Sequence, residues 1–147
     1  MVAGVVNYTQ VDALVACGGD TPPYAFPSLA EQGVRTIVNL RLHDEPGVAG
    51  EAQVACAAGL RYVHVPITPT EPEFEAAERF LEVVADPENQ PIYIHCASAN
   101  RVGGVWAIKR VVQDGWSRDA ALAEGQAIGL KSPVMIEFVH RFLDARG

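Results

Sequence analysis

The stretch I-Y-I-H-C-A-S-A-N-R at residues 92–101 decides the fold around it, because it predicts a strand that turns directly into a helix. Ile92–His95 is the apolar run typical of a buried strand, and the mostly apolar run from Arg101 to Val112 predicts a buried helix. Between them lies Cys96, followed by small residues. A thiolate that faces the N–H groups of a helix start, with a guanidinium behind it, can hold an oxyanion. The segment therefore predicts covalent chemistry on phosphate or on a related tetrahedral or sulfur-bearing group.

Outward from this segment, short apolar runs and amphipathic runs alternate along the chain, separated by glycine and proline. A helix is expected behind Thr70–Glu73, which resembles a capping box because a hydroxyl is followed three residues later by a glutamate. The alternation indicates an α/β fold, with a central, mostly parallel sheet of about four to five strands and helices on both faces. We expect strands over residues 13–17, 35–40, 61–65 and 92–95, and helices over residues 27–33, 51–58, 101–112 and 117–129 and from Ser132 onward.

The loops that follow the predicted strands identify where a ligand would bind. In sheets of this kind, ligands bind beyond the carboxyl ends of the strands. Four loops therefore converge on one rim of the sheet, and the cysteine loop is one of them. These loops are Gly18–Pro23, Arg41–Gly47, Pro66–Pro72 and Cys96–Asn100.

Length and composition are those of one globular domain, which we expect to occupy residues 1–147. The formal charge is −7 and there is no long basic run, which argues against nucleic-acid binding. No apolar run approaches the roughly 20 residues of a membrane span, and the N-terminus lacks the pattern of a signal peptide. We therefore expect a cytoplasmic protein without nucleic-acid or membrane partners; an exported form with a removed signal peptide stays open.

The cysteines and histidines do not have the spacing of metal ligands. The three cysteines, Cys17, Cys56 and Cys96, are too few and odd in number for a disulfide scaffold and fit a reducing compartment. The four histidines are scattered, and no Cys-x2-Cys or His-x3-His pair occurs. We therefore expect neither a metal nor a cofactor.

The chemistry of the cysteine loop depends on Cys96 and Arg101. The dipole and free N–H groups of the following helix favour the thiolate form of Cys96, and Arg101 adds a permanent positive charge. The same N–H groups and the guanidinium would bind the equatorial oxygens of a phosphoryl group. Small residues at positions 97–99 let the backbone approach the anion closely. The alternative is a buried structural cysteine at a strand end.

The segment I-H-C-A-S-A-N-R-V-G at residues 94–103 resembles the His-Cys-x5-Arg signature of cysteine-dependent phosphatases. The resemblance extends upstream to bacterial phosphatases of the dual-specificity-like superfamily, in particular a subgroup related to a β-lactamase-hydrolase-like protein. It covers roughly residues 13–130, which gives it more weight than one short motif. The upstream stretches that carry it are residues 18–22, 29–34, 36–41, 58–62 and 65–67.

The resemblance implies a role for each residue of the loop. Cys96 would be the nucleophile that forms a cysteinyl-phosphate, and Arg101 would bind phosphate and stabilise the transition state. His95 would orient and tune the thiolate through hydrogen bonds from beneath the loop, although a core histidine satisfied by backbone is an equal alternative. The substrate would be a phosphoprotein or a small phosphomonoester. The backbone N–H groups that would complete the phosphate cradle are those of Ala97, Ser98, Ala99, Asn100 and Arg101.

The loop departs from the superfamily pattern at three points. Four residues separate Cys96 from Arg101, where most of the superfamily has five, and sulfurtransferases of the rhodanese type have loops of about this shorter length. Ala99 stands where the relatives usually have glycine, so a positive φ at this position would cost about 1 kcal/mol or more. Val102 replaces the Ser or Thr that often bonds the sulfur, and Ser98 is a candidate for that function.

The general acid is not evident from the sequence. The superfamily commonly supplies an aspartate about thirty residues before the cysteine, but residues 64–72 contain only Glu71, which the capping box already explains. Asp44 and Glu45 lie on another rim loop, and we predict Asp44 as the acid, with Glu45 and Glu71 as alternatives. Arg41, at the end of its strand, would aid anion binding or pair with one of these acids.

Three functions fit these residues. The first is a phosphomonoester hydrolase of the protein-tyrosine or dual-specificity-like class, working through a cysteinyl-phosphate on Cys96. The second is sulfur transfer through a Cys96 persulfide, against which stands the lack of a His-Ile-Pro-Gly-Ala stretch of the rhodanese type. The third is a pseudophosphatase that binds phosphate or phosphoproteins and has lost the acid.

Overall fold

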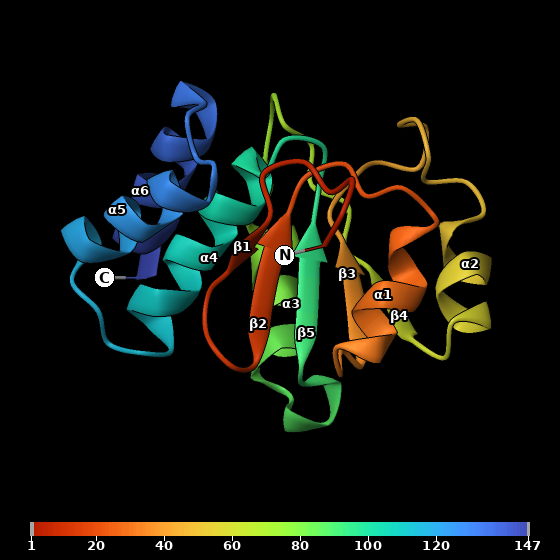
Figure 1. Cartoon of the computed structure of the whole chain (residues 1–147). Coiled ribbons are helices and arrows are strands. Elements are labelled where there is room, and N and C mark those ends of the chain that lie inside the picture. The colour runs from red at the N-terminus through yellow and green to blue at the C-terminus, as the bar shows by residue number, and fades with distance from the viewer. Residues whose placement is uncertain (1, 147) are drawn as a thin grey trace.

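A five-stranded sheet forms the centre of the computed structural model, which describes residues 2–146 (Figure 1). The strand order is β1-β2-β5-β3-β4; β2, β5, β3 and β4 are parallel, and β1 pairs antiparallel with β2 at one edge. This confirms the predicted α/β fold with a mostly parallel sheet. The strands are β1 Thr9–Gln10, β2 Val15–Gly18, β3 Thr36–Asn39, β4 Arg61–His64 and β5 Ile92–His95.

The predicted strands agree with the structure to within about two residues, and β5 has the predicted bounds. The edge strand β1 was not predicted, because it consists of two polar residues and is too short to show a periodicity. β2 extends to Gly18, one residue beyond the predicted end, because it pairs in register with β5 up to His95.

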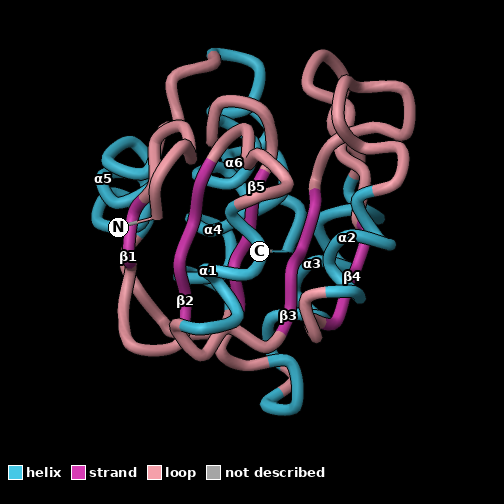
Figure 2. Tube along the Cα trace, turned by 45° about the vertical axis from the view of Figure 1, so that its right-hand side comes forward, coloured by secondary structure: helices cyan, strands magenta, loops and turns pink. Residues whose placement is uncertain are grey.

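Helices cover both faces of the sheet, as predicted (Figures 1 and 2). Helices α1 and α2 lie over one face, α3 and α4 lie over the other, and α5 and α6 pack against the outer side of α4. The helices are α1 Ala25–Glu31, α2 Glu51–Ala57, α3 Phe74–Ala85, α4 Asn100–Val112, α5 Arg118–Ile128 and α6 Pro133–Arg146, with a short 3-10 helix at Pro87–Asn89. Among residues 2–146, no helix is long and apolar enough to span a membrane.

The alternation of side chains along the strands produces two apolar layers. On one face, Ile37 and Tyr93 pack with Phe26 of α1. On the other face, Ile94 packs with Trp106 of α4. The three inner strands, β2, β3 and β5, are buried on both faces, which is why their sequences are mostly apolar.

The predicted capping box at Thr70–Glu73 is wrong. Helix α3 begins at Phe74, and Glu73 is its N-cap residue without a capping hydrogen bond from its side chain to any described residue. The reason is Pro72, since a residue before proline is driven out of the helical region, and Glu71 therefore cannot open a helix. In contrast, Ser117 caps α5 as predicted, because its Oγ accepts a hydrogen bond from the N–H of Ala120 at 3.2 Å.

The carboxyl ends of the four parallel strands lie at one edge of the sheet. The loops after β2, β3, β4 and β5 therefore meet at this rim, as the parallel topology requires (Figure 2). The loop after β5 contains Cys96, and it lies between the loops after β2 and β3 because β5 is the central strand. The fold thus places the candidate site at the middle of the rim.

Candidate active site

Cys96 lies directly beyond β5, at the N-terminus of α4. Its side chain is buried, and its backbone N–H donates to the carbonyl of Gly18 at 3.3 Å, which joins it to the end of β2. Its Sγ accepts a hydrogen bond from the N–H of Ala99 at 3.2 Å. The 13-residue helix α4 starts only four residues later, at Asn100, so its dipole is directed at the sulfur.

Ala99 has the strained backbone that the sequence analysis anticipated for a glycine position. Its φ is 73°, in the left-handed region, where an alanine costs about 1–2 kcal/mol. The side chain is buried against Gly129, where an added Cβ would lie 2.8 Å from the Cβ of Ala99. The tight loop is therefore kept by the packing around it rather than by the preference of its own residues.

Ser98 does not replace the missing hydroxyl after Arg101, contrary to expectation. Its Oγ accepts from the side-chain amide of Asn100 at 3.2 Å, and Val102 is buried in the core. The Asn100 Oδ1 accepts from the backbone N–H groups of Lys131 and Ser132 at 2.6 and 2.8 Å, which ties the loop to the start of α6. The side chains of Ser98 and Asn100 are therefore engaged within the protein, with each other and with the start of α6.

Arg101 is buried and held by an acidic partner. Its Nη1 and Nη2 each donate to one carboxylate oxygen of Glu45 at 2.7 Å, and Nη1 also donates to the carbonyl of Ile67 at 3.1 Å. A guanidinium carries five N–H donors. Glu45 and Ile67 use both donors of Nη1 and one of Nη2, which leaves the Nε–H and one Nη2–H on the same edge. Such an edge is the fork that binds two oxygens of a phosphate.

The charges of Arg101 and Glu45 support each other. Burial lowers the pKa of Arg101, but its hydrogen bonds to Glu45 and the nearby Cys96 outweigh this effect and raise the pKa above its usual value. The pKa of Glu45 lies below its usual value, chiefly because Arg101 donates to its carboxylate. An ionised carboxylate does not donate a proton, which counts against Glu45 as the general acid. The geometry instead makes it the residue that orients Arg101.

Asp44 is exposed beside Glu45, on the wall of a cavity of about 450 Å³. This cavity opens between the loops after β3 and β4, which both contact Arg101 through Glu45 and Ile67. Glu71, the other acid considered, is exposed and does not line the cavity. The residues around the cavity are Leu42, His43, Asp44, Pro66, Thr68, Glu73 and Ala76.

Arg41 pairs with acids other than those expected. Its Nη2 donates to Glu51 at 2.6 Å, its Nη1 lies 3.5 Å from Asp20, and its Nε donates to the side chain of Asn39 at 3.2 Å. Neither Asp44 nor Glu45 is its ion-pair partner. Most N–H donors of Arg41 are therefore engaged by groups of the protein, and few are left to bind an anion.

His95 is connected to this second network and not to the cysteine loop. Its Nε2 lies 2.8 Å from the other carboxylate oxygen of Glu51, and its Nδ1 has no hydrogen-bond partner among residues 2–146. The expected hydrogen bonds from the His95 ring to the loop are thus replaced by a buried contact with Glu51 beneath it. Sequence reasoning did not identify Glu51, since a glutamate at the start of a helix is usually exposed. Within the described residues, no group of three or more His, Cys, Asp or Glu side chains could hold a metal ion.

The sheet order and the site together define a dual-specificity-phosphatase-like α/β protein. The core catalytic domain of the PP-IP phosphatase Siw14 from S. cerevisiae superimposes with a TM-score of 0.82 over 99% of this chain and 91% of that one, at 20% identity. P. aeruginosa TpbA in complex with pTyr superimposes with a TM-score of 0.72 over 92% of this chain and 82% of that one, also at 20% identity. At such low identities, these structures establish the fold alone.

The chain belongs to the family of DSP-PTPase phosphatases fused to NAD+ kinase, whose model matches residues 6–134. It is 30% identical over 128 residues to the β-lactamase hydrolase-like protein of Xylella fastidiosa, a match that covers 84% of this chain. The chain spans about 30% of the length of that relative. The family resemblance predicted from residues 13–130 is thereby confirmed.

Proposed function

We propose that this protein is a phosphomonoester hydrolase that works through a cysteinyl-phosphate on Cys96. One observation carries the proposal: the Cys96 sulfur lies at the start of α4, beside Arg101. The sulfur accepts a hydrogen bond from the N–H of Ala99, and the free edge of Arg101 has two N–H donors. Membership of a phosphatase family supports it. The same family membership favours phosphoryl transfer over sulfur transfer through a persulfide.

In the first step, the Cys96 thiolate attacks phosphorus, an S–P bond forms, and the bond to the leaving oxygen breaks. The leaving oxygen takes a proton from the acid, for which we propose Asp44. The backbone N–H groups of residues 97–101 and the free edge of Arg101 stabilise the charge on the three equatorial oxygens. In the second step, water attacks phosphorus, its proton passes to the Asp44 carboxylate, and the S–P bond breaks to release phosphate.

Asp44 is proposed as the acid because of the loop that carries it. The paired carboxylate of Glu45 fixes this loop against Arg101, and Asp44 is the next residue along it. Its side chain is exposed on the cavity between the loops after β3 and β4, which both contact Arg101 through Glu45 and Ile67.

The charge of the site favours substrates with a single phosphate. Two proteins of the same fold differ in this respect: P. aeruginosa TpbA is seen in complex with pTyr, and Siw14 is named a PP-IP phosphatase. In this chain, Arg101 is paired with Glu45 and Arg41 with Glu51, so neither guanidinium adds a net positive charge to the rim. We therefore propose phosphoproteins or small phosphomonoesters as substrates.

The proposal is tested by incubation with an aryl phosphate and, separately, with thiosulfate and cyanide, using Cys96→Ser as the control. Release of phosphate that disappears in Cys96→Ser supports the hydrolase. Phosphatase activity that survives this change overturns the site assignment. Thiocyanate formation without phosphate release points to sulfur transfer, and bound phosphate without turnover of either substrate points to a binding module.

A further inference from the structure

Two donors from the N-terminal part of the chain bind the outer side of the cysteine loop. The backbone N–H of Asp20 donates to the carbonyl of Ala97 at 2.7 Å. The side-chain amide of Asn7 donates to the carbonyl of Ser98 at 3.0 Å. These carbonyls belong to consecutive peptide groups, so two successive peptides of the loop are held from the same side.

Holding a carbonyl also aims the N–H of the same peptide. In a trans peptide, the C=O and N–H bonds point in opposite directions. An Asn7 amide that holds the Ser98 carbonyl outward therefore directs the Ala99 N–H inward, where it donates to Cys96 Sγ at 3.2 Å. By the same reasoning, Asp20 directs the Ser98 N–H toward the cradle.

The segment that carries Asn7 is itself fixed against the end of β2. The N–H of Gly19 donates to the carbonyl of Val6 at 2.7 Å, and the N–H of Val6 donates to the carbonyl of Asp20 at 3.1 Å. We call residues 5–7 together with residues 18–20 the N-terminal brace. It approaches the loop so closely that a Cβ on Gly19 would lie 2.4 Å from the carbonyl oxygen of Ala97.

The loop needs this support because its own conformation is strained. Ala99 has a φ of 73°, and strained backbone persists only where its surroundings over-determine it. Asn7 has a φ of 53°, in a region that asparagine tolerates better than most residues. A residue that takes this conformation and also offers an amide donor fits the position well.

We propose that Asn7 is a positioning residue of the reaction, which keeps the Ser98–Ala99 peptide turned so that its N–H faces the Cys96 sulfur and the bound phosphoryl group. The part about the phosphoryl group rests on the proposed function. The part about the sulfur does not, and a measurement on the thiol alone can test it.

The test compares Asn7→Ala and Asn7→Asp with Gln10→Ala. The Gln10 amide lies on the same segment and also donates to backbone carbonyls, those of Asp12 and Val15, but not to the loop. The readout is the ultraviolet absorbance of the Cys96 thiolate as a function of pH, measured as the difference between each variant and its Cys96→Ser counterpart. Loss of the amide donor should move the midpoint of this titration upward and reduce the thiolate fraction below the midpoint about fivefold.

Asn7→Asp should have the larger effect, since a carboxylate at this place repels the Ser98 carbonyl. For the phosphatase reaction, kcat should fall in each Asn7 variant by about the factor by which its thiolate fraction falls, with little change in KM. Thermal unfolding of all variants checks the fold, and Gly19→Ala gives a second perturbation through the Ala97 carbonyl. Thiolate titrations of both Asn7 variants that coincide with that of Gln10→Ala would overturn the proposal. A shifted titration in a protein without phosphatase activity would uphold the positioning role and reject the proposed reaction instead.

Discussion

Glu45 fixes the guanidinium of Arg101 through two parallel hydrogen bonds. The carboxylate of Glu45 accepts hydrogen bonds from Nη1 and Nη2 of Arg101, and the edge formed by Nε and Nη2 stays open toward Cys96. A free arginine side chain loses considerable conformational freedom when it binds an anion, and an arginine that is already fixed loses less. The bidentate pair therefore prepares the site in addition to balancing charge.

We predict that Glu45→Gln weakens both catalysis and stability at neutral pH. Because the folded-state pKa of Glu45 is depressed by Arg101, the stability that the pair contributes is present above the unfolded pKa of about 4.3 and is lost as pH falls through the lower folded value. The stability deficit of Glu45→Gln should therefore be seen at pH 7 and should shrink toward zero below about pH 4. Urea unfolding at both pH values measures it.

The matched control is Glu75→Gln, an exposed glutamate in the first turn of α3. It should leave kcat unchanged, whereas Glu45→Gln should lower kcat about tenfold because Arg101 loses its orientation. A rise in kcat for Glu45→Gln would mean that the carboxylate blocks the anion site instead of preparing it.

Asp44→Asn should reduce kcat for the hydrolysis of phosphate esters. The loss should be larger for leaving groups of high pKa, which need a proton to depart. We expect a loss of about tenfold or more for alkyl phosphates and a much smaller loss for nitrophenyl phosphate, whose leaving group is stable without a proton. Steady-state kinetics over a series of leaving groups measures the difference. Equal losses across the series would exclude Asp44 as the acid.

Ala99→Gly should stabilise the protein by about 0.5–1 kcal/mol. Glycine removes the strain of a left-handed alanine, and its greater freedom in the unfolded chain offsets only part of this gain. Denaturant unfolding measures the change, with Ala97→Gly in the same loop as the control that has no such strain to relieve. A loss of stability in Ala99→Gly would show that its packing against Gly129 outweighs the strain.

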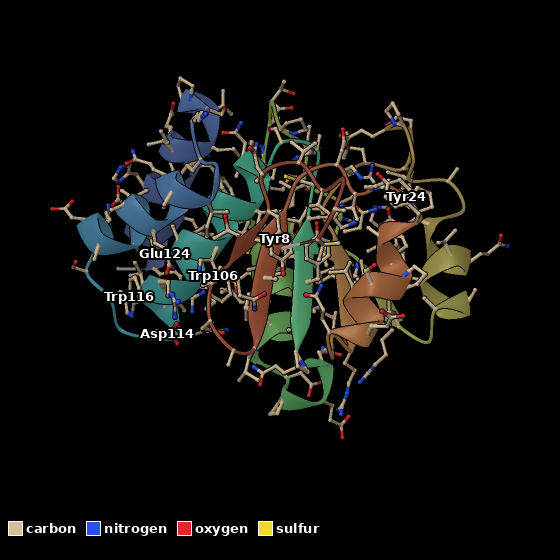
Figure 3. All side chains as sticks on the ribbon, in the orientation of Figure 1. Tyr8, Tyr24, Trp106, Asp114, Trp116 and Glu124 are labelled. Atoms are coloured by element: carbon tan, nitrogen blue, oxygen red, sulfur yellow. The ribbon has the colours of Figure 1, made fainter. Side chains whose placement is uncertain are left out.

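At the scale of elements, α4 carries the cysteine loop, and α5 fixes α4 through a cluster around Arg110. Arg110 donates to Glu124 at 2.8 Å and to Asp114 at 3.0 Å, and its guanidinium lies 4.3 Å from the ring centre of Trp116. Glu124 also accepts from the indole N–H of Trp106 at 2.7 Å. Figure 3 shows these aromatic and acidic side chains together on the side of α4 and α5.

Arg110→Ala should destabilise the fold by about 2 kcal/mol, because it leaves Glu124 and Asp114 without a major partner and exposes two indole rings. The pKa of Asp114 is held below its usual value, where its hydrogen bonds from Lys109 and Arg110 outweigh the burial that raises it. Denaturant unfolding measures the loss, with the exposed Arg141→Ala as the control. A loss no larger than that of Arg141→Ala would contradict the role of the cluster.

Sequence patterns predicted most helices and strands, because buried apolar residues recur along the chain with the period of the helix or strand that they form. The strand, turn and helix around Cys96 could all be predicted from the sequence, because they follow one another directly in the chain. Helix α3 begins behind Thr70–Glu73 as expected, but the hydroxyl–glutamate spacing does not form a capping box, because Pro72 keeps Glu71 out of the helical region. The strand β1 depends on its pairing with β2, which two residues do not encode locally.

At the scale of the whole molecule, the net charge of −7 and the paired arginines give the rim little positive field. Polyanionic substrates should therefore be disfavoured. We predict that kcat/KM for a phosphotyrosine peptide exceeds that for an inositol pyrophosphate by at least about tenfold. Kinetics at two ionic strengths provide the check, since the turnover of a monophosphate should depend only weakly on salt. A preference for the pyrophosphate would contradict this assignment.

The sequence by itself determined the α/β class, the rim and the Cys96–Arg101 loop, because these follow from apolar periodicity and from residues close together in the chain. Only the tertiary structure decided the partners of the loop. Glu45 lies 56 residues from Arg101, Glu51 lies 44 residues from His95, and Asn7 lies 91 residues from Ser98. Polar residues of this kind carry no periodic signal, and their roles exist only where the order of the parallel strands brings separate loops to one edge.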